Sequence, residues 1–168
     1  ERDGSLGLRD LEAVAAEDTA VFVVSFVQYK SGFRNDLARL GAFCRERDLV
    51  FVVDATQGFG AFPLDASDSA ADFLSFSGYK WATSGYSIAG LYLSERFLTP
   101  EQFPLVGWRS PQEPYALSYD HLDLPERAAV LEQGHPPFAG VFALGASLDL
   151  IQEIGIAKIA ARITELTG

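Results

Sequence analysis

Two short runs of β-branched and aromatic residues constrain the fold of this chain more than any other feature. They are VFVVSFV at residues 21–27 and VFVV at residues 50–53. Each run predicts a strand buried on both faces, which is typical of a parallel sheet. Between them, residues 36–48 carry Leu37, Leu40 and Cys44 at helical spacing. Strand, helix and strand in this order predict an α/β fold with a mostly parallel sheet flanked by helices.

The remaining elements follow from the same patterns. Residues 73–76 and 88–93 are expected to add a third and a fourth strand, so the sheet has about four strands. Helices are expected at residues 6–17 (with Ser5 as cap), at 138–154 and from 156 onward, with one or two helical turns within 65–72. Residues 95–137 hold seven of the eight prolines. A long irregular stretch of this kind is usually functional or interfacial.

Composition restricts the function classes. Acidic residues outnumber basic ones 23 to 13, so we expect neither nucleic acid nor an anionic membrane as partner. No apolar stretch approaches the roughly 20 residues of a membrane span. A single cysteine excludes an internal disulfide framework and a multi-cysteine zinc site. These features fit the cytoplasm. The chain has no Met and opens on ERDGS, so we expect it to be a piece of a longer protein.

Chemistry-bearing residues follow the predicted second and third strands. Asp54 and Gln57 come after the second strand, and Ser77 and Lys80 come after the third. Taken alone, Asp54 is equally interpretable as a turn-capping residue, and Lys80 is better interpreted as a surface lysine. Together they supply the amine and the acid that Schiff-base chemistry on pyridoxal phosphate requires. Ser77 and Tyr79 offer hydroxyls for the phosphate.

Three segments carry a resemblance to a known family: VDATQ at 53–57, DFLSFSGYKW at 72–81 and IAGLYL at 88–93. Together they resemble the class V aminotransferase family of fold-type I pyridoxal-phosphate enzymes, which includes cysteine desulfurases and kynureninases. The resemblance runs from about residue 8 to the C-terminus and is most specific at 50–93. It implies the central part of the large domain in residues 1–155 and a helix, 156–168, leading toward a small domain.

The resemblance also implies roles for individual residues. Lys80 would form the internal aldimine and later move the substrate α-proton, and Asp54 would pair with the pyridine nitrogen. Gln57 would bond the 3-oxygen of the ring, while Ser77 and Tyr79 would contact the phosphate. The implied cofactor is pyridoxal 5'-phosphate, the implied substrate is a small amino acid, and the implied assembly is a homodimer. The ring-stacking aromatic residue, the first phosphate loop and the carboxylate-binding arginine of the family would lie outside residues 1–168.

Other positions match the family less closely. EQGHP at 132–136, with Gly134 and His135, looks like the loop that reaches the partner subunit's site, where many members carry Thr instead of His135. Phe26 stands where many relatives have Asn or His. The segments VQY at 27–29 and VGW at 106–108 are similar to the kynureninase side of the family. Trp108 is therefore equally interpretable as a substrate or dimer contact and as a packing anchor.

Several alternatives remain open at this stage. The reaction could be transamination, a related lyase reaction or kynureninase-like hydrolysis of a C–C bond. The chain could also be an incomplete or non-catalytic relative. Ser77 and Lys80 match the S-x-x-K pattern of serine acylases, although the accompanying S-D-N and K-T-G motifs are absent. Gly58 and Gly60 suggest only weakly a nucleotide-binding loop, because the third glycine is missing.

Metal binding and cysteine chemistry are not expected. His121 and His135 are the only histidines and show no ligand spacing. Asp65, Asp68 and Asp72 lack the glycine pattern of a calcium loop, which favours a solvated acidic face. Cys44 lies among apolar neighbours in a predicted helix and is expected to pack in the core.

Overall fold

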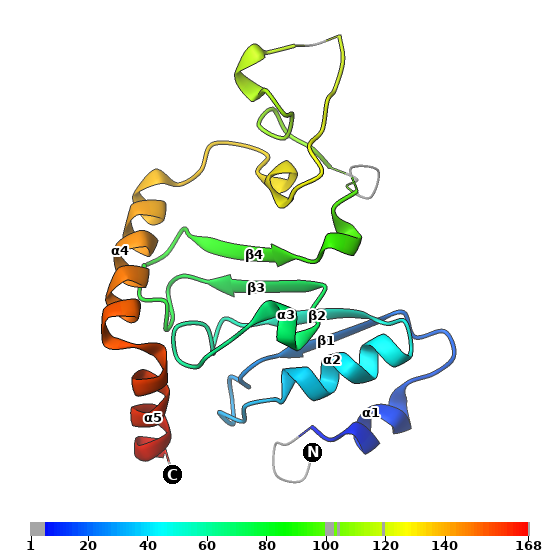
Figure 1. Ribbon diagram of the computed structural model, residues 1–168, viewed down its shortest axis with the longest axis vertical. Coiled ribbons are helices and arrows are strands. Elements are labelled where there is room, and N and C mark those ends of the chain that lie inside the picture. Colours follow the sequence, from blue (N-terminus) through cyan, green and yellow to red (C-terminus); the bar gives the residue numbers. More distant parts are fainter. Residues whose placement is uncertain (1–5, 100–102, 104, 119, 168) are drawn as a thin grey trace.

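The sheet that the sequence predicts is present and has four strands in chain order. A computed structural model describes residues 6–99, 103, 105–118 and 120–167 (Figure 1). Its strands are β1 (Val21–Ser25), β2 (Val50–Asp54), β3 (Phe73–Ser77) and β4 (Ala89–Leu93). β1, β2 and β3 are parallel, and β4 is antiparallel to β3. The predicted α/β class with a mostly parallel sheet is therefore confirmed.

Three helices cover one face of this sheet: α1 (Leu8–Val14), α2 (Leu37–Glu46) and α3 (Ala66–Ser69) (Figure 1). α2 begins after Asp36, whose Oδ1 accepts a hydrogen bond of 3.1 Å from the Arg39 nitrogen and so caps the helix. α1 is shorter than expected, with Gly7 at its N-cap, and the Ser5 cap lies outside the described residues. The buried core under these helices includes Leu11, Val24, Leu37, Leu40, Phe43, Cys44, Phe51, Val53 and Leu74.

The opposite face of the sheet is open, so the prediction of strands buried on both faces is wrong for the described residues. Val21 is 50% exposed and Val23 is 65% exposed. Parallel crossovers are right-handed, and both cross the sheet in the same direction. As a result α2 and α3 fall on the same side. The open face carries the side chains of Val23, Asp54, Ser75 and Ser77. Side chains alternate between the two faces along each strand, and Asp54 pairs with Ser75 in register, so these residues share a face.

The proline-rich segment is irregular, as predicted. Its described part holds short 3-10 turns, η1 (Glu95–Phe97), η3 (Pro114–Ala116) and η4 (Ala128–Leu131). Figure 1 shows this segment beyond the β4 edge of the sheet. It is thus separated from the carboxyl ends of β1 and β2 by the width of the sheet.

Two helices close the chain, α4 (Phe138–Ile154) and α5 (Ile156–Thr167), and stand beside the carboxyl end of β3 (Figure 1). Gly155 separates them with a φ of 91°. Among the described helices none is long and apolar enough on its own to cross a membrane, and α4 with α5 pass that test only jointly, across a 78° bend. The domain boundary at residue 155 stays a prediction.

Candidate active site

Hydrogen bonds join the carboxyl ends of β2 and β3 at the candidate site. Asp54 ends β2, and its Oδ1 accepts a bond of 2.9 Å from the Thr56 nitrogen. The Thr56 hydroxyl oxygen accepts a bond of 3.2 Å from the nitrogen of Ser77, the last residue of β3. Thr56 was not singled out from the sequence, because a threonine two residues after an aspartate is an ordinary turn pattern. The structure makes it the link between two predicted site residues.

Lys80 lies in a tight loop that its own backbone closes. The Gly78 nitrogen donates to the Ile88 oxygen across 2.8 Å, and the Ser84 nitrogen donates to the Gly78 oxygen across 2.9 Å. The Thr83 nitrogen donates to the Lys80 oxygen across 2.9 Å. These bonds fix the backbone of Lys80 at the exit of β3.

Helix α4 holds this loop from the side. The buried Ser147 hydroxyl donates to the Ala82 carbonyl oxygen and also hydrogen-bonds with the Thr83 hydroxyl. Gly140, in the first turn of α4, packs against Ile88. Helix α4 therefore supports the Lys80 loop, although the two lie far apart in sequence.

Aromatic rings surround the Lys80 ammonium group. Its Nζ lies 5.3 Å from the centre of the Tyr79 ring and 5.7 Å from that of Tyr29. Tyr79 in turn stacks on Tyr86 at 5.1 Å. Lys80 and Asp54, both described, form no ion pair within 4.0 Å. Neither charge is therefore neutralised by the other. The sequence indicated Tyr29 only as part of a family-like segment, and its place beside Lys80 comes from the fold.

The glycines after β2 serve close packing. Gly58 lies against the ring of Phe26, where a Cβ would overlap that ring. Gly60 has a φ of 87°, and a Cβ there would lie 2.7 Å from the Trp81 carbonyl oxygen. Phe26 itself is buried and packs edge-on against Phe62 at 6.4 Å, so it is a core residue. These contacts account for both glycines without a nucleotide.

The acylase pattern also finds no support in the geometry. Ser77 ends a strand, whereas that chemistry requires a serine that opens a helix. In the part of the chain that the structure describes, no hydrogen bond joins the Ser77 hydroxyl to Lys80. Ser77 and Lys80 therefore lie near each other in sequence without forming a nucleophile–base pair.

The donor set at this edge fits the cofactor that the sequence implies. It holds a carboxylate (Asp54), a half-buried amide (Gln57), hydroxyls (Ser77 and Tyr79) and an amine (Lys80). Pyridoxal phosphate needs these four kinds of group. They would contact its protonated pyridine nitrogen, its ring oxygen, its phosphate and its aldehyde. Asp54 and Ser77 lie on the same open face of the sheet. The chemistry of the residues present is thus complete for those four contacts.

Trp108 and His135 meet each other but not the Lys80 site. Their ring centres are 4.9 Å apart, and Tyr115 meets Trp108 at 5.9 Å. Gly107 presses against the Gln133 backbone, which brings the 105–110 and 132–135 segments together. At Gly134 itself a Cβ would meet nothing within 4 Å. Trp108 is therefore packed against the predicted partner-subunit loop, and that loop's role stays a prediction.

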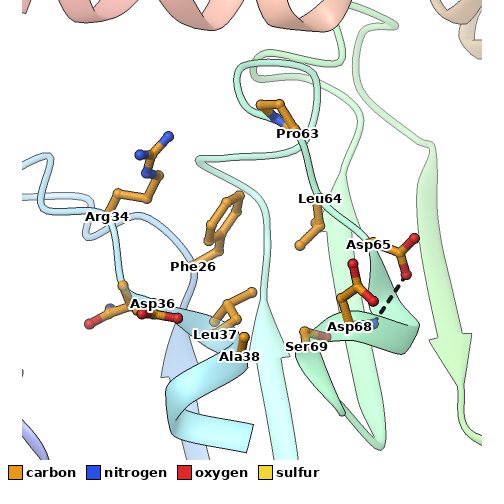
Figure 2. A pocket seen from close by; sticks show the side chains of 11 residues that line it. Phe26, Arg34, Asp36, Leu37, Ala38, Pro63, Leu64, Asp65, Asp68 and Ser69 are labelled. Carbon is orange, nitrogen blue, oxygen red and sulfur yellow. Dashed lines mark hydrogen bonds between the residues drawn. The ribbon is translucent and has the colours of Figure 1, made fainter.

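A different pocket, of about 380 Å³, lies between the N-terminal ends of α2 and α3 (Figure 2). Asp65 there accepts a bond of 3.2 Å from the Asp68 nitrogen, and both aspartates are exposed, as predicted.

Asp72 was predicted to be solvated as well, and this is wrong. It is 5% exposed, because it binds backbone and side chains at the amino end of the sheet. In the described residues no three metal-ligating side chains gather.

Cys44 is in the core, as predicted. It is 1% exposed, and burial, reinforced by the nearby Asp72 carboxylate, raises the pKa of its thiol to about 11. A buried thiol of this kind is protonated at neutral pH and is a poor nucleophile.

Comparisons with known proteins relate this chain to one family of enzymes. A family model described as Aminotransferase class-V matches residues 1–168. A probable cysteine desulfurase of Pyrococcus abyssi is 32% identical over 157 residues, 94% of this chain and 38% of that protein. Cysteine desulfurase IscS of Pectobacterium atrosepticum is 42% identical over 80 residues, 48% of this chain and 20% of that protein.

Solved structures of cysteine desulfurases share the fold of this chain. The apo structure of a cysteine desulfurase from Thermococcus onnurineus has a TM-score of 0.80 at 30% identity, over 94% of this chain and 38% of that one. The cysteine desulfurase CsdA from Escherichia coli has a TM-score of 0.76 at 27% identity, over 90% and 37%. The chain thus spans well under half the length of the proteins that it matches.

Proposed function

The chain belongs to the aminotransferase class-V family, and from that premise we propose that it is the cofactor-holding part of a pyridoxal-phosphate enzyme acting on an amino acid through Lys80. Its relatives are cysteine desulfurases, of which it covers only a part. The observation that carries the proposal is the arrangement at the edge of the sheet. Asp54 and Ser77, linked by Thr56, end adjacent strands, and a closed loop presents Lys80 directly after Ser77.

Each residue of this edge has a role in the proposal. The Asp54 carboxylate keeps a proton on the pyridine nitrogen, and the Gln57 amide donates to the ring oxygen. The hydroxyls of Ser77 and Tyr79 donate to the phosphate. When bound, pyridoxal phosphate supplies an electron sink for charge at the substrate α-carbon. Lys80 Nζ holds the cofactor's aldehyde carbon and, once free, takes and returns the proton at the substrate α-carbon.

The fixed loop matters for this proton transfer. A general base works only within hydrogen-bond reach of the proton that it moves. The bonds from Ser147 to Ala82 and from Thr83 to the Lys80 oxygen restrict the backbone that carries the amine. Ordering the loop in advance reduces the entropy that would otherwise be lost when substrate binds.

Two reactions can follow removal of the α-proton in this proposal: transamination and a related lyase reaction. Cysteine desulfuration is the activity that the relatives' names suggest. Cys44 is the only cysteine of this chain, and it is buried with a raised pKa, so it does not act as a sulfur acceptor. Kynureninase-like hydrolysis is a second candidate, favoured by the aromatic rings of Tyr29 and Tyr79 around Lys80. The 132–136 loop is proposed to reach a partner subunit in a homodimer.

Borohydride trapping tests the proposal directly. The purified protein is mixed with pyridoxal phosphate, its visible absorbance is recorded, and the adduct is reduced and located by peptide mapping. The chain has only three lysines, Lys30, Lys80 and Lys158, and peptide mapping distinguishes them from one another and from the N-terminal amine. We expect one adduct, on Lys80, lost in Lys80→Ala and retained in Lys30→Ala and Lys158→Ala. No adduct, or one shared among the three lysines, would favour the alternative of a non-catalytic relative.

A further inference from the structure

A cavity of about 450 Å³ opens beside the Lys80 loop. Its walls come from the turn after β1, the turn after β2, the residue after Lys80 and helix α5. The lining residues that matter are four aromatic side chains and two amides: Tyr29, Phe33, Phe62, Trp81, Gln28 and Gln57. None of its lining residues is Asp, Glu, Lys, Arg or His.

We propose that this cavity receives the side chain of the amino-acid substrate and selects an aromatic one. The inference rests on the proposed function and names its substrate class. Tyr29 connects the cavity to the reacting centre, because its ring lines the cavity and also lies 5.7 Å from Lys80 Nζ. Gln57, assigned to the cofactor ring, lines the same cavity. A substrate whose α-carbon is near the Lys80 amine can therefore extend its side chain toward these walls.

The walls favour a flat apolar group. Tyr29 is 80% exposed and Trp81 is 44% exposed, so within the described part of the chain both rings offer accessible surface. An aromatic ligand gains from burial of its own area and from ring–ring contact. A charged side chain would lose part of its hydration and would find no opposite charge among the lining residues, which is costly. A methyl or thiol group would leave most of the volume unfilled.

The backbone that carries two of the aromatic walls is fixed before any ligand arrives. The Gln28 nitrogen donates to the Phe33 oxygen across 2.8 Å, and the Gly32 nitrogen donates to the Gln28 oxygen across 2.9 Å. This hydrogen-bonded turn fixes the backbone of Tyr29. On the other side the close approach of Gly60 to the Trp81 carbonyl fixes the backbone of Trp81. Preorganised walls lose less conformational entropy on binding.

Stable phosphopyridoxyl amino acids test the inference without any turnover. These compounds join the reduced cofactor to an amino acid, so their binding does not depend on covalent reaction with Lys80. Dissociation constants are measured by calorimetry for the phenylalanine, alanine and aspartate compounds. We expect the phenylalanine compound to bind about tenfold more tightly than the alanine compound, from the burial of one ring. The aspartate compound should bind no more tightly than the alanine compound.

Variants locate the preference. Tyr29→Ala should reduce the phenylalanine-to-alanine ratio to about threefold or less, since one ring contact is lost, whereas Tyr29→Phe should preserve it. Phe142→Ala removes an exposed aromatic ring from α4, outside the cavity, and should leave the ratio unchanged. A phenylalanine compound that binds no better than the alanine compound would overturn the inference and leave the proposed function standing. Failure of all three compounds and of pyridoxal phosphate itself would overturn both.

Discussion

The carboxylate of Asp72 accepts a hydrogen bond of 2.8 Å from the backbone nitrogen of Phe51. Asp72 directly precedes β3 and Phe51 lies in β2, so the bond joins the two strands at the end opposite Lys80. The other carboxylate oxygen accepts from the Ser94 hydroxyl at 3.1 Å and lies 3.0 Å from Arg96 Nε. One buried carboxylate thus ties β2, β3 and the segment after β4 together.

Replacing this carboxylate should destabilise the sheet. We expect Asp72→Ala to lower the free energy of unfolding by about 3 kcal/mol, because it leaves the buried N–H of Phe51 without its acceptor and removes the nearer carboxylate partner of Arg96. Urea denaturation measures the change. Asp68→Ala, at an exposed position, is the matched control and should cost under about 1 kcal/mol. Equal losses in the two variants would contradict the anchoring role of Asp72.

Asp54 should matter for binding of the cofactor more than for folding. Asp54→Asn keeps an oxygen for the Thr56 nitrogen but removes the negative charge. We expect affinity for pyridoxal phosphate to fall by about tenfold or more, the value of a hydrogen bond between charged groups. Absorbance titration measures the affinity, and urea denaturation checks that stability changes little. An unchanged affinity would remove Asp54 from the proposed site.

Gly60 should resist substitution more strongly than another glycine of similar backbone conformation. Gly60 has a φ of 87° and Gly85 a φ of 79°, but only at Gly60 would a Cβ meet backbone atoms, with the Trp81 oxygen at 2.7 Å. Gly85→Ala should therefore cost only the strain of a left-handed residue, about 1 kcal/mol.

The loss of unfolding free energy in Gly60→Ala should be larger than that in Gly85→Ala by at least about 1 kcal/mol, since the Lys80 loop must also shift. Thermal unfolding of the two variants side by side checks the difference. Trapping of pyridoxal phosphate on Lys80 should also be weaker in Gly60→Ala than in Gly85→Ala. Equal stability of the two variants would show that the turn after β2 can move away from Trp81 without loss.

Cys44 should make the protein less stable at alkaline pH. The pKa of its thiol is about 11 in the folded chain against 9.0 for the ordinary group. The unfolded chain therefore loses this proton first. The contribution of Cys44 is fully present below pH 9 and declines as the pH rises through 11, by up to about 3 kcal/mol.

The matched measurement compares the unfolding free energy of the wild type and Cys44→Ala between pH 8 and about pH 11. The variant loses some stability at every pH because a small cavity forms. Its slope over this range should nevertheless be shallower than that of the wild type. Identical slopes would show that Cys44 does not contribute to the alkaline loss of stability.

The sequence predicts the elements of this fold because each depends on local spacing. The β-branched run at 50–53 and the helical stripe of Leu37, Leu40 and Cys44 are visible without any long-range information. Two predictions were wrong, and both concerned burial: that of Asp72 and that of the strands. Val21 and Val23 have the composition of a strand covered on both sides, yet burial depends on where the crossover helices pack, which residue type does not encode.

By itself the sequence determined the α/β class, the family resemblance and the positions of Asp54, Gln57, Ser77 and Lys80 after two strands, since strand ends follow from apolar periodicity. Only the tertiary structure decided which side chains accompany Lys80. Tyr29 and Ser147 lie 51 residues before it and 67 residues after it. Tyr29 reaches the ammonium group and Ser147 the loop only because parallel pairing aligns the strand ends and α4 packs across them. Such contacts depend on packing between distant segments, and no local pattern specifies them.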